Sequence, residues 1–325
     1  MADQAKMANI RSIAEQANEK SERRHLKSVS SNLPRQAANE QPRATQEAHT
    51  ALRNQAPRND GNSMIPVDVR GNAANSSSRD LQAVNDAVLL AERERKELAL
   101  MEDKKLFSDR QLDQLGIVHP RSPNRPVVDS IRQLRTKLFS LRKTGNFSVL
   151  VSSVVPGGGG SFVALNLAAS IAFDQTKTSL LLDANLQNPF LHKMLKLIGR
   201  KNANGLVDFL EAPDMGVENI VHPSGIPRMR IMPAGSPQRY SEEHLSSQLC
   251  HKLMIDIQQR YGNRYVVVDG PAMSGSADAS ILADLCDYLV LVVPYGAVTP
   301  GQLDSLIDEI DETKLAGIVL NDQPE

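Results

Sequence analysis

Six short apolar runs alternate with longer, helix-like segments over the second half of the chain. Apolar strands of this length, separated by helices, are typical of a parallel sheet that is covered by helices on both faces. The pattern therefore predicts an α/β fold with a doubly wound, mostly parallel sheet. The predicted strands are Ser148–Ser153, Ser179–Leu182, Arg228–Met232, Tyr265–Val268, Tyr288–Val293 and Gly317–Leu320.

Helical periodicity is clearest on either side of the first strand. Apolar residues share one face of a helix predicted over Val127–Arg142, and Phe162–Phe173 is predicted to be helical directly after the strand. Residues 106–126 contain three prolines, which predict a loop-like lead into the domain. Residues 81–106 carry a narrow apolar stripe, which predicts a helical linker or a docking helix.

Aromatic residues are absent from the first part of the chain. The sequence has 7 Phe, 5 Tyr and no Trp, and none of them precedes Phe107. A polar segment without aromatic side chains buries too little apolar surface to offset the entropy that it loses on ordering. We therefore expect a disordered polar tail over residues 1–80, the helical linker or docking helix over 81–106, and the folded domain over 107–325.

Charge and cysteine content restrict the setting of the protein. The formal net charge is −1, which argues against a nucleic acid partner. Cys250 and Cys286 are far apart and form no CxxC pair, as expected in a reducing compartment. There is no apolar run of about 18 residues, as a membrane span requires, and no secretion signal at the N-terminus. These features predict a cytoplasmic protein.

The glycine-rich stretch Pro156–Ser161 lies between the first predicted strand and the helix that follows it. This is the layout of a phosphate-binding loop, in which backbone N–H groups and a helix N-terminus hold an anion. Ser161 is then the expected Mg²⁺ ligand. The position before this serine normally carries a lysine that reaches the terminal phosphates, and here it is Gly160. The sequence therefore has the glycine-rich loop and the following helix but lacks the fixed positive charge of the lysine.

Two carboxylates follow buried strands. Asp183 ends the second predicted strand, and Asp269 ends the fourth. Because the carboxyl ends of parallel strands meet at one edge of a sheet, both are expected beside the glycine-rich loop. They are candidates to hold Mg²⁺ and to polarise an attacking hydroxyl group or water. The alternative for each of them is a helix cap, which is common for aspartate at strand ends.

In this order, the motifs closely resemble those of the bacterial tyrosine kinases (BY-kinases). These are ATPase modules that are attached to, or partnered with, membrane co-polymerases of capsule and exopolysaccharide export. The family's loop P-G-E-G-K-S/T corresponds to residues 156–161. Its motif D-x-D-x-R-x-P-x-x-H is matched by Asp183, Asn185, Gln187, Pro189 and His192, and its motif D-x-P-P by Asp269, Pro271 and Ala272. The resemblance covers residues 125–325, about two-thirds of the chain.

Further matches carry no chemistry. Asn166-Leu167-Ala168 resembles the family's N-L-A, Gly205–Leu210 resembles G-L-x-D-x-L, and Met232–Gly235 resembles L-P-A-G. The spacing of Asp129, Arg132 and Arg135 is similar to the E-x-x-R-x-x-R helix through which these kinases form rings. The resemblance therefore implies that these three residues lie in an oligomer interface.

The resemblance also implies a cofactor, a partner and a location. ATP or ADP with Mg²⁺ is the expected cofactor, with weak or absent binding because Gly160 replaces the lysine. The predicted nucleotide contacts are Gly157, Gly158, Gly159, Gly160, Ser161, Phe162, Asp183 and Asp269, and the predicted Mg²⁺ ligands are Ser161, Asp183 and Asp269. The implied partner is an inner-membrane polysaccharide co-polymerase of the chain-length-determinant type. That partner would hold this cytoplasmic chain, or a homo-oligomer of it, at the inner membrane.

Departures from the family's pattern separate three functional hypotheses. Gly160, Asn185 in place of the second carboxylate, and the missing C-terminal tyrosine cluster favour a pseudokinase that regulates or scaffolds exopolysaccharide assembly. The first alternative is an active tyrosine autokinase, with Asp183 and Asp269 as catalytic residues and a substitute cation such as Arg132 or Arg135 of a neighbouring subunit. The second is a MinD/ParA-type positioning ATPase, although Val155 stands where those proteins carry another lysine.

Overall fold

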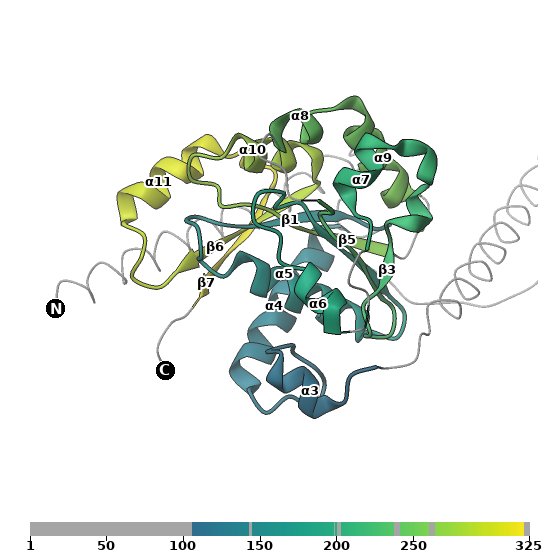
Figure 1. The fold of residues 1–325 in the computed structure, drawn as a ribbon. Helices are drawn as coiled ribbons and strands as arrows, with labels where there is room; N and C mark the ends of the chain where they lie inside the picture. The colour runs from purple at the N-terminus through teal and green to yellow at the C-terminus, as the bar shows by residue number, and fades with distance from the viewer. Residues whose placement is uncertain are drawn as a thin grey trace, which may run out of the picture. The chain divides into compact units, whose positions relative to one another are not determined.

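The computed structural model describes residues 106–142, 145–197, 199, 203–236, 241–259 and 264–321 (Figure 1). The predicted tail over residues 1–80 lies outside the described residues, as does the helix predicted over 81–106 except for its last residue. Within the described part of the chain, no helix is both long and apolar enough to cross a membrane.

A seven-stranded sheet forms the centre of the domain, with the strand order β3-β4-β2-β5-β1-β6-β7. All neighbouring strands pair in parallel except β3 and β4, which are antiparallel. The predicted mostly parallel sheet is therefore confirmed. The strands are β1 (Ser148–Ser153), β2 (Thr178–Asp183), β3 (His222–Pro223), β4 (Met229–Met232), β5 (Arg264–Asp269), β6 (Tyr288–Pro294) and β7 (Leu315–Asn321).

All six predicted strands are present, and each predicted residue except one lies within its strand. The exception is Arg228, which was expected in β4 but precedes it with a φ of 62°. The sequence pattern missed β3 altogether. This strand is two residues long, lies at the edge of the sheet and contains Pro223. Proline donates no ladder hydrogen bond, and such strands leave no apolar run to detect.

Helices cover both faces of the sheet (Figure 1). Those described are α3 (Asp109–Gln114), α4 (Arg125–Leu141), α5 (Gly160–Ala172), α6 (His192–Leu197), α7 (Leu206–Glu211), α8 (Ser241–Leu245), α9 (Gln248–Gln259), α10 (Ala277–Leu285) and α11 (Pro300–Glu309). Two short 3₁₀ helices, Pro213–Met215 and Val217–Asn219, lie between α7 and β3.

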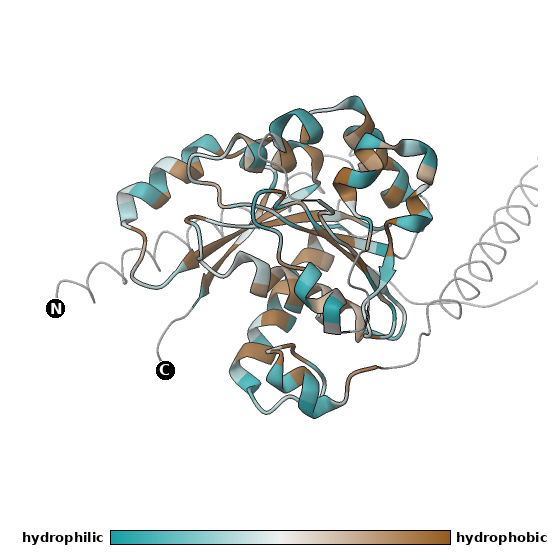
Figure 2. Ribbon diagram, in the orientation of Figure 1, coloured by the Kyte–Doolittle hydropathy of each residue, from teal (hydrophilic) through white to brown (hydrophobic). Residues whose placement is uncertain are grey.

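Side chains alternate along each strand between two apolar cores, because successive residues of a strand point to opposite faces. In β1, Leu150 packs into the core beneath α7 to α11, while Val149 and Val151 pack into the core with α3, α4 and α5. Figure 2 shows apolar residues along the strands and on the sides of the helices that pack against the sheet. With helices on both faces, β1, β2 and β6 are buried along their whole length, which explains their unbroken apolar runs in the sequence.

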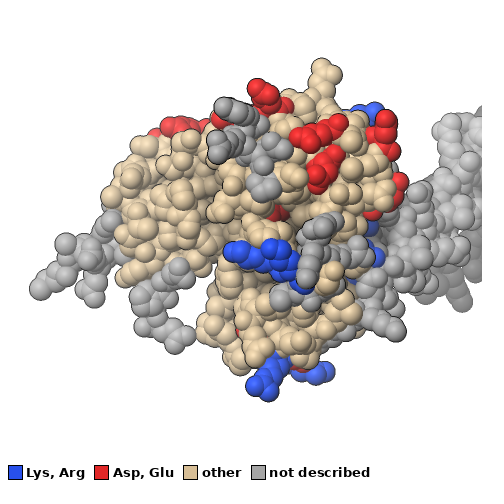
Figure 3. All heavy atoms as spheres, viewed as in Figure 1, with Lys and Arg blue, Asp and Glu red and all other residues tan. Residues whose placement is uncertain are grey.

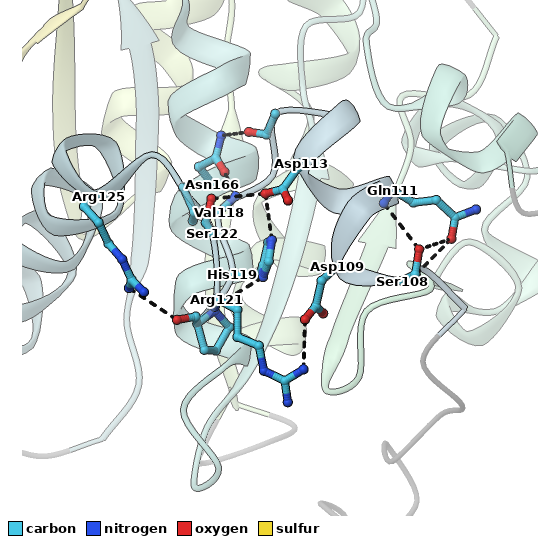
Figure 4. Close-up of polar contacts among 12 residues, drawn as sticks. Ser108, Asp109, Gln111, Asp113, Val118, His119, Arg121, Ser122, Arg125 and Asn166 are labelled. Carbon is cyan, nitrogen blue, oxygen red and sulfur yellow. Dashed lines mark hydrogen bonds and ion pairs between the residues drawn. The ribbon is translucent and has the colours of Figure 1, made fainter.

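The lead segment contains a helix that the sequence analysis missed. Residues 106–126 were expected to be a loop, but α3 forms within them. Its N-cap Ser108 and Gln111 make a capping box, in which each side chain bonds the backbone N–H of the other residue (Figure 4). The pattern Ser-x-x-Gln was the available signal, and three nearby prolines outweighed it.

Asn166 fixes this lead segment to α5, the helix that follows β1. Its side-chain oxygen accepts a hydrogen bond from the Val118 backbone N–H at 2.7 Å, and its amide nitrogen donates to the Gly116 carbonyl oxygen (Figure 4). The same amide nitrogen also donates to the Phe162 carbonyl oxygen. Nearby, the His119 ring bonds the Asp113 carboxylate at 2.8 Å. The N-L-A motif therefore has a structural explanation, because a buried side chain with no exposed surface satisfies three backbone groups.

Replacing Asn166 by alanine should lower the free energy of unfolding by about 2–3 kcal/mol, because buried backbone groups lose their partners. The matched control is Ser130→Ala, which removes an exposed hydrogen bond to Pro126 on α4 and should cost less than about 0.5 kcal/mol. Denaturant unfolding of the full chain, followed by circular dichroism, measures both. Equal midpoints for the two variants would contradict the role given to Asn166.

Candidate functional site

The glycine-rich loop joins β1 to the N-terminus of α5. Gly159 is the N-cap of α5, and no side chain caps this helix end. The first turn of a helix has N–H groups without partners in the helix, and its dipole favours an anion at this end. The sequence therefore places an uncapped helix N-terminus at the carboxyl edge of the sheet, where α/β proteins bind phosphate groups.

Two loop glycines adopt a backbone conformation that favours glycine. Gly157 has a φ of 76° and Gly159 a φ of 89°. A Cβ on Gly159 would also overlap the Asn321 side chain, whose amide nitrogen donates to the Gly158 carbonyl oxygen at 3.3 Å. Asn321 ends β7, so the last strand holds the loop in place. The loop is consequently a fixed turn, rather than an unstructured run of glycines.

Gly160 is the first residue of α5 and is buried. A Cβ built there would lie 3.2 Å from the Ser153 backbone nitrogen and 3.6 Å from its Cβ. A side chain therefore requires a shift of only a few tenths of an ångström. The backbone at this position therefore does not require glycine, and a lysine side chain could be accommodated there.

Asp269 is buried at the end of β5, close to the Ser161 hydroxyl. Neither oxygen receives a hydrogen bond of standard geometry from the described residues. Burial raises the pKa of this carboxyl group to about 8, with a further contribution from the negative charge of Asp183, while the Ser161 hydroxyl lowers it. A buried, unpartnered carboxylate beside a serine hydroxyl fits a site that is completed by a cation.

Asp183 lies beside Asp269 in the register of β2 and β5, as the sequence predicted. Its carboxylate accepts backbone hydrogen bonds from Phe190 at 2.8 Å, Leu191 at 2.9 Å and Asn185 at 3.3 Å. Burial raises its pKa to about 6 against the opposing effect of these bonds. Asp183 therefore anchors the loop that carries Asn185, Gln187 and Pro189, which we call the second motif (residues 183–192). This structural role is additional to the predicted ligand role.

The residues present fit a magnesium ion only together with a nucleotide. No group of three or more His, Cys, Asp and Glu residues in the described ranges is arranged as a metal site. Mg²⁺ is commonly held by one or two carboxylates, with phosphate oxygens and water completing its octahedron. Ser161 and Asp269 would supply protein ligands, and Asp183 lies next to Asp269 on the neighbouring strand. When bound, the ion would neutralise phosphate charge.

A cavity of about 650 Å³ opens above the loop. Gly157–Ser161 line one side, the second motif lines another through Asn185, Gln187 and Phe190, and α10 closes the third through Ala277 and Asp278. Lys193 and Glu242 also line it. Asn185 thus borders the cavity where the family has its second carboxylate, and it brings an amide instead of a base.

Gln187 has a new contact in place of the family's arginine. Its amide nitrogen lies 3.2 Å from the Ser241 hydroxyl and 3.4 Å from the Asp278 carboxylate, which also accepts a hydrogen bond from Ser241. These bonds connect the second motif to α8 and α10. Sequence reasoning missed Ser241 and Asp278, because they belong to no motif and meet Gln187 only in the fold.

Some predicted site residues lie away from the cavity walls. The Phe162 side chain is exposed and faces Gly116, so only its backbone in the first turn of α5 is placed to contact a ligand. Asp129 and Arg132 form an exposed ion pair of 3.8 Å on α4, while Arg135 donates to the Ser170 carbonyl oxygen at 2.7 Å. The interface assigned to these three residues stays a prediction.

On the face drawn in Figure 3, acidic side chains gather over the upper helices, and basic side chains lie near the middle and the lower end. Among the described residues drawn on this face (Figure 3), Lys and Arg form no continuous surface of the kind that binds a nucleic acid backbone.

Replacing Asp269 by asparagine should change how stability depends on pH in magnesium-free buffer. An unfolded aspartate has a pKa of about 4, whereas the folded value is about 8. The unfolded chain therefore loses this proton first, and the free energy of unfolding falls as pH rises from about 4 to about 8. Asp269→Asn removes this contribution, so the variant should gain in relative stability across the same range.

Denaturant unfolding at several pH values between 5 and 9, with EDTA present, measures the effect. The control is Asp304→Asn on the exposed side of α11, which should follow the unaltered profile. Parallel profiles for Asp269→Asn and the unaltered chain would contradict the charge state assigned to this buried group.

The comparisons with known proteins agree with this geometry. No family model matches the chain. EpsB of Ralstonia solanacearum is 30% identical over 231 residues, which cover 66% of this chain and 30% of EpsB. The tyrosine-protein kinase CpsD of Streptococcus agalactiae is 28% identical over 179 residues, which cover 54% of this chain and 75% of CpsD. The chain thus spans less than a third of the length of EpsB.

Among solved structures, the kinase domain of the Escherichia coli tyrosine kinase ETK superposes with a TM-score of 0.54 at 23% identity. The match covers 66% of this chain and 92% of that domain. At this identity the likeness establishes the fold. Together with the sequence matches, it leads to one conclusion: this chain is a homologue of the bacterial tyrosine kinases and has the P-loop ATPase fold of their kinase domains.

Proposed function

We propose that this chain is a catalytically degenerate BY-kinase that regulates or scaffolds exopolysaccharide or capsule assembly. In this proposal the domain binds ATP or ADP with Mg²⁺ weakly and transfers no phosphoryl group at a useful rate. It acts in the cytoplasm, where it docks on an inner-membrane co-polymerase of the chain-length-determinant type. The pathway is proposed from the family resemblance and the names of the relatives, and the loss of catalysis from the residues of the site.

One observation carries the proposal: the phosphate cradle is intact while two charged groups around it are replaced. Gly160 begins α5 where the lysine is expected, and Asn185 borders the cavity where a carboxylate is expected. A hydrogen bond to a charged group contributes about 1.5–3 kcal/mol, so losing the lysine weakens binding by about one to two powers of ten. Loss of a general base typically costs about 10²–10⁴ in rate. Catalysis is therefore affected more than binding.

An active tyrosine autokinase is the first alternative, and one feature of the site supports it. Asp269 keeps an unpartnered carboxylate beside Ser161, as a working magnesium site requires. In that case Asp183 and Asp269 would be catalytic, and a substitute cation would replace the missing lysine. A MinD/ParA-type positioning ATPase is less well supported, because Val155 replaces the second lysine of that class.

Binding and phosphotransfer, measured side by side on the full chain, test the proposal. We expect calorimetric titration to detect weak Mg·ATP binding. Immunoblotting is expected to detect no phosphotyrosine, with or without the cytoplasmic segment of a co-polymerase from the same genome. The ETK kinase domain, assayed in parallel, is the positive control. Phosphotyrosine on the unaltered chain would favour the autokinase instead.

A further inference from the structure

We propose that Lys193 supplies, within the same chain, the positive charge that the phosphate loop lacks. Its ligand would be the terminal phosphates of a nucleoside di- or triphosphate bound in the cavity above Gly157–Ser161. This inference rests on the proposed nucleotide site. It adds the residue that would contribute phosphate affinity in place of the missing loop lysine.

The fold brings Lys193 to the wall of the cavity that the glycine-rich loop also lines. Lys193 lies in the first turn of α6, directly after the second motif, and it lines the same cavity as Gly160 and Ser161. Asp183 fixes the preceding segment through its bonds from the Phe190 and Leu191 backbone N–H groups. The lysine therefore starts from an anchored backbone at the carboxyl edge of the sheet.

The ammonium group is available to an anion. Lys193 is exposed, and its Nζ lies 5.5 Å from the centroid of the Phe190 ring, which also lines the cavity. Among the described residues it forms no ion pair. An aromatic ring attracts a cation with less strength than a carboxylate does, so it holds the charge near the cavity without neutralising it.

The charge balance of the cavity gives this lysine its importance. Among the described residues that line the cavity, Lys193 is the sole Lys or Arg, whereas Glu242 and Asp278 are acidic. Asp183 and Asp269 lie buried at the adjacent ends of β2 and β5. A triphosphate entering this site would meet acidic groups from several sides, so Mg²⁺ and Lys193 together would have to offset its charge. Lysine suits this task because its stem is long and flexible.

The experiment compares three single variants of the full chain by titration with fluorescently labelled ATP in the presence of Mg²⁺. Lys193→Met removes the charge and keeps the length of the side chain, and it should weaken binding by about tenfold or more. Lys193→Arg keeps the charge and should retain most of the affinity. Lys196→Met is the matched control on the same helix, because Lys196 is exposed and does not line the cavity; it should change the affinity by less than about twofold.

The number of phosphates provides a second readout. Since Lys193 is assigned to the terminal phosphates, Lys193→Met should weaken the binding of Mg·ATP and ADP but leave that of AMP unchanged. Affinity for Mg·ATP within twofold of the unaltered chain would overturn the role of Lys193 and leave the proposed nucleotide site standing. If the unaltered chain binds no nucleotide at all, both the site and this inference fail. Thermal melts of the variants verify that all of them are folded.

Discussion

Replacing Gly160 by lysine should tighten Mg·ATP binding by about tenfold in the unaltered background, because a charge-assisted hydrogen bond to the phosphates is restored. The backbone accepts the change, since a Cβ there would lie 3.2 Å from the Ser153 nitrogen and needs only a small shift. Gly160→Met is the control, because it adds a similar bulk and stiffens the loop without adding charge. Calorimetric titration measures both variants.

The size of this gain depends on Lys193. If Lys193 already faces the phosphates, a second lysine adds less, because the two positive charges repel each other and share the same anion. Gly160→Lys should therefore gain up to about a hundredfold when it is introduced into Lys193→Met. An equal gain in both backgrounds would mean that the two positions do not act on the same ligand.

Tighter binding should not restore phosphotransfer. Asn185 still borders the cavity in place of a carboxylate, and an amide cannot accept the proton of an attacking hydroxyl group. Gly160→Lys alone should thus stay inactive in a phosphotyrosine assay. A measurable rate is expected only when Asn185→Asp is added. A competent kinase from the single change would contradict the role assigned to Asn185.

Replacing Gly205 by alanine should be among the most destabilising single changes in the domain. A Cβ at Gly205 would lie 2.7 Å from the Ala234 carbonyl carbon, and it would be closer still to the Pro233 oxygen and the Gly235 nitrogen. All three are backbone atoms, so no side chain can rotate away. Overpacking costs typically about 1–3 kcal/mol, and we expect about 3 kcal/mol or more here, because backbone must move.

The same contact joins two of the sequence motifs, Gly205–Leu210 and Met232–Gly235. The Leu206 and Val207 backbone N–H groups bond the Pro233 and Ala234 carbonyl oxygens at 2.8 and 3.0 Å, which joins α7 to the end of β4. Gly301→Ala is the control, since its Cβ would meet nothing within 4 Å on α11. That variant should be neutral or more stable by up to about 1 kcal/mol. Equal unfolding midpoints for the two variants would contradict the predicted clash.

The sequence was sufficient for the sheet, because buried parallel strands leave apolar runs that a single chain displays. It was insufficient for β3, whose two residues leave no such run, and for α3, whose capping signal lay among prolines. The loop and both aspartates were placed at the correct edge by their positions after strands. The ligand set assigned to them stays a prediction.

Other features of the site depend on contacts that no local pattern encodes. Asp183 was expected as a ligand beside Asp269, and its three bonds to backbone N–H groups emerge only when the second motif folds back over β2. The role of Lys193 could not be predicted from the sequence, because a lysine directly after a motif matches no pattern of its own. Only the fold reveals that it shares a cavity with Gly160.

The site is proposed to bind ATP but not to transfer its phosphoryl group, and a single-turnover experiment is the most direct test of this. The full chain, in excess over radiolabelled ATP and with Mg²⁺ present, is incubated for hours with and without the co-polymerase segment, and the bound nucleotide is then identified. We predict that it is recovered as intact ATP and that no label appears on the protein. Conversion to ADP at a rate well above that of the Asp269→Asn variant would contradict the account.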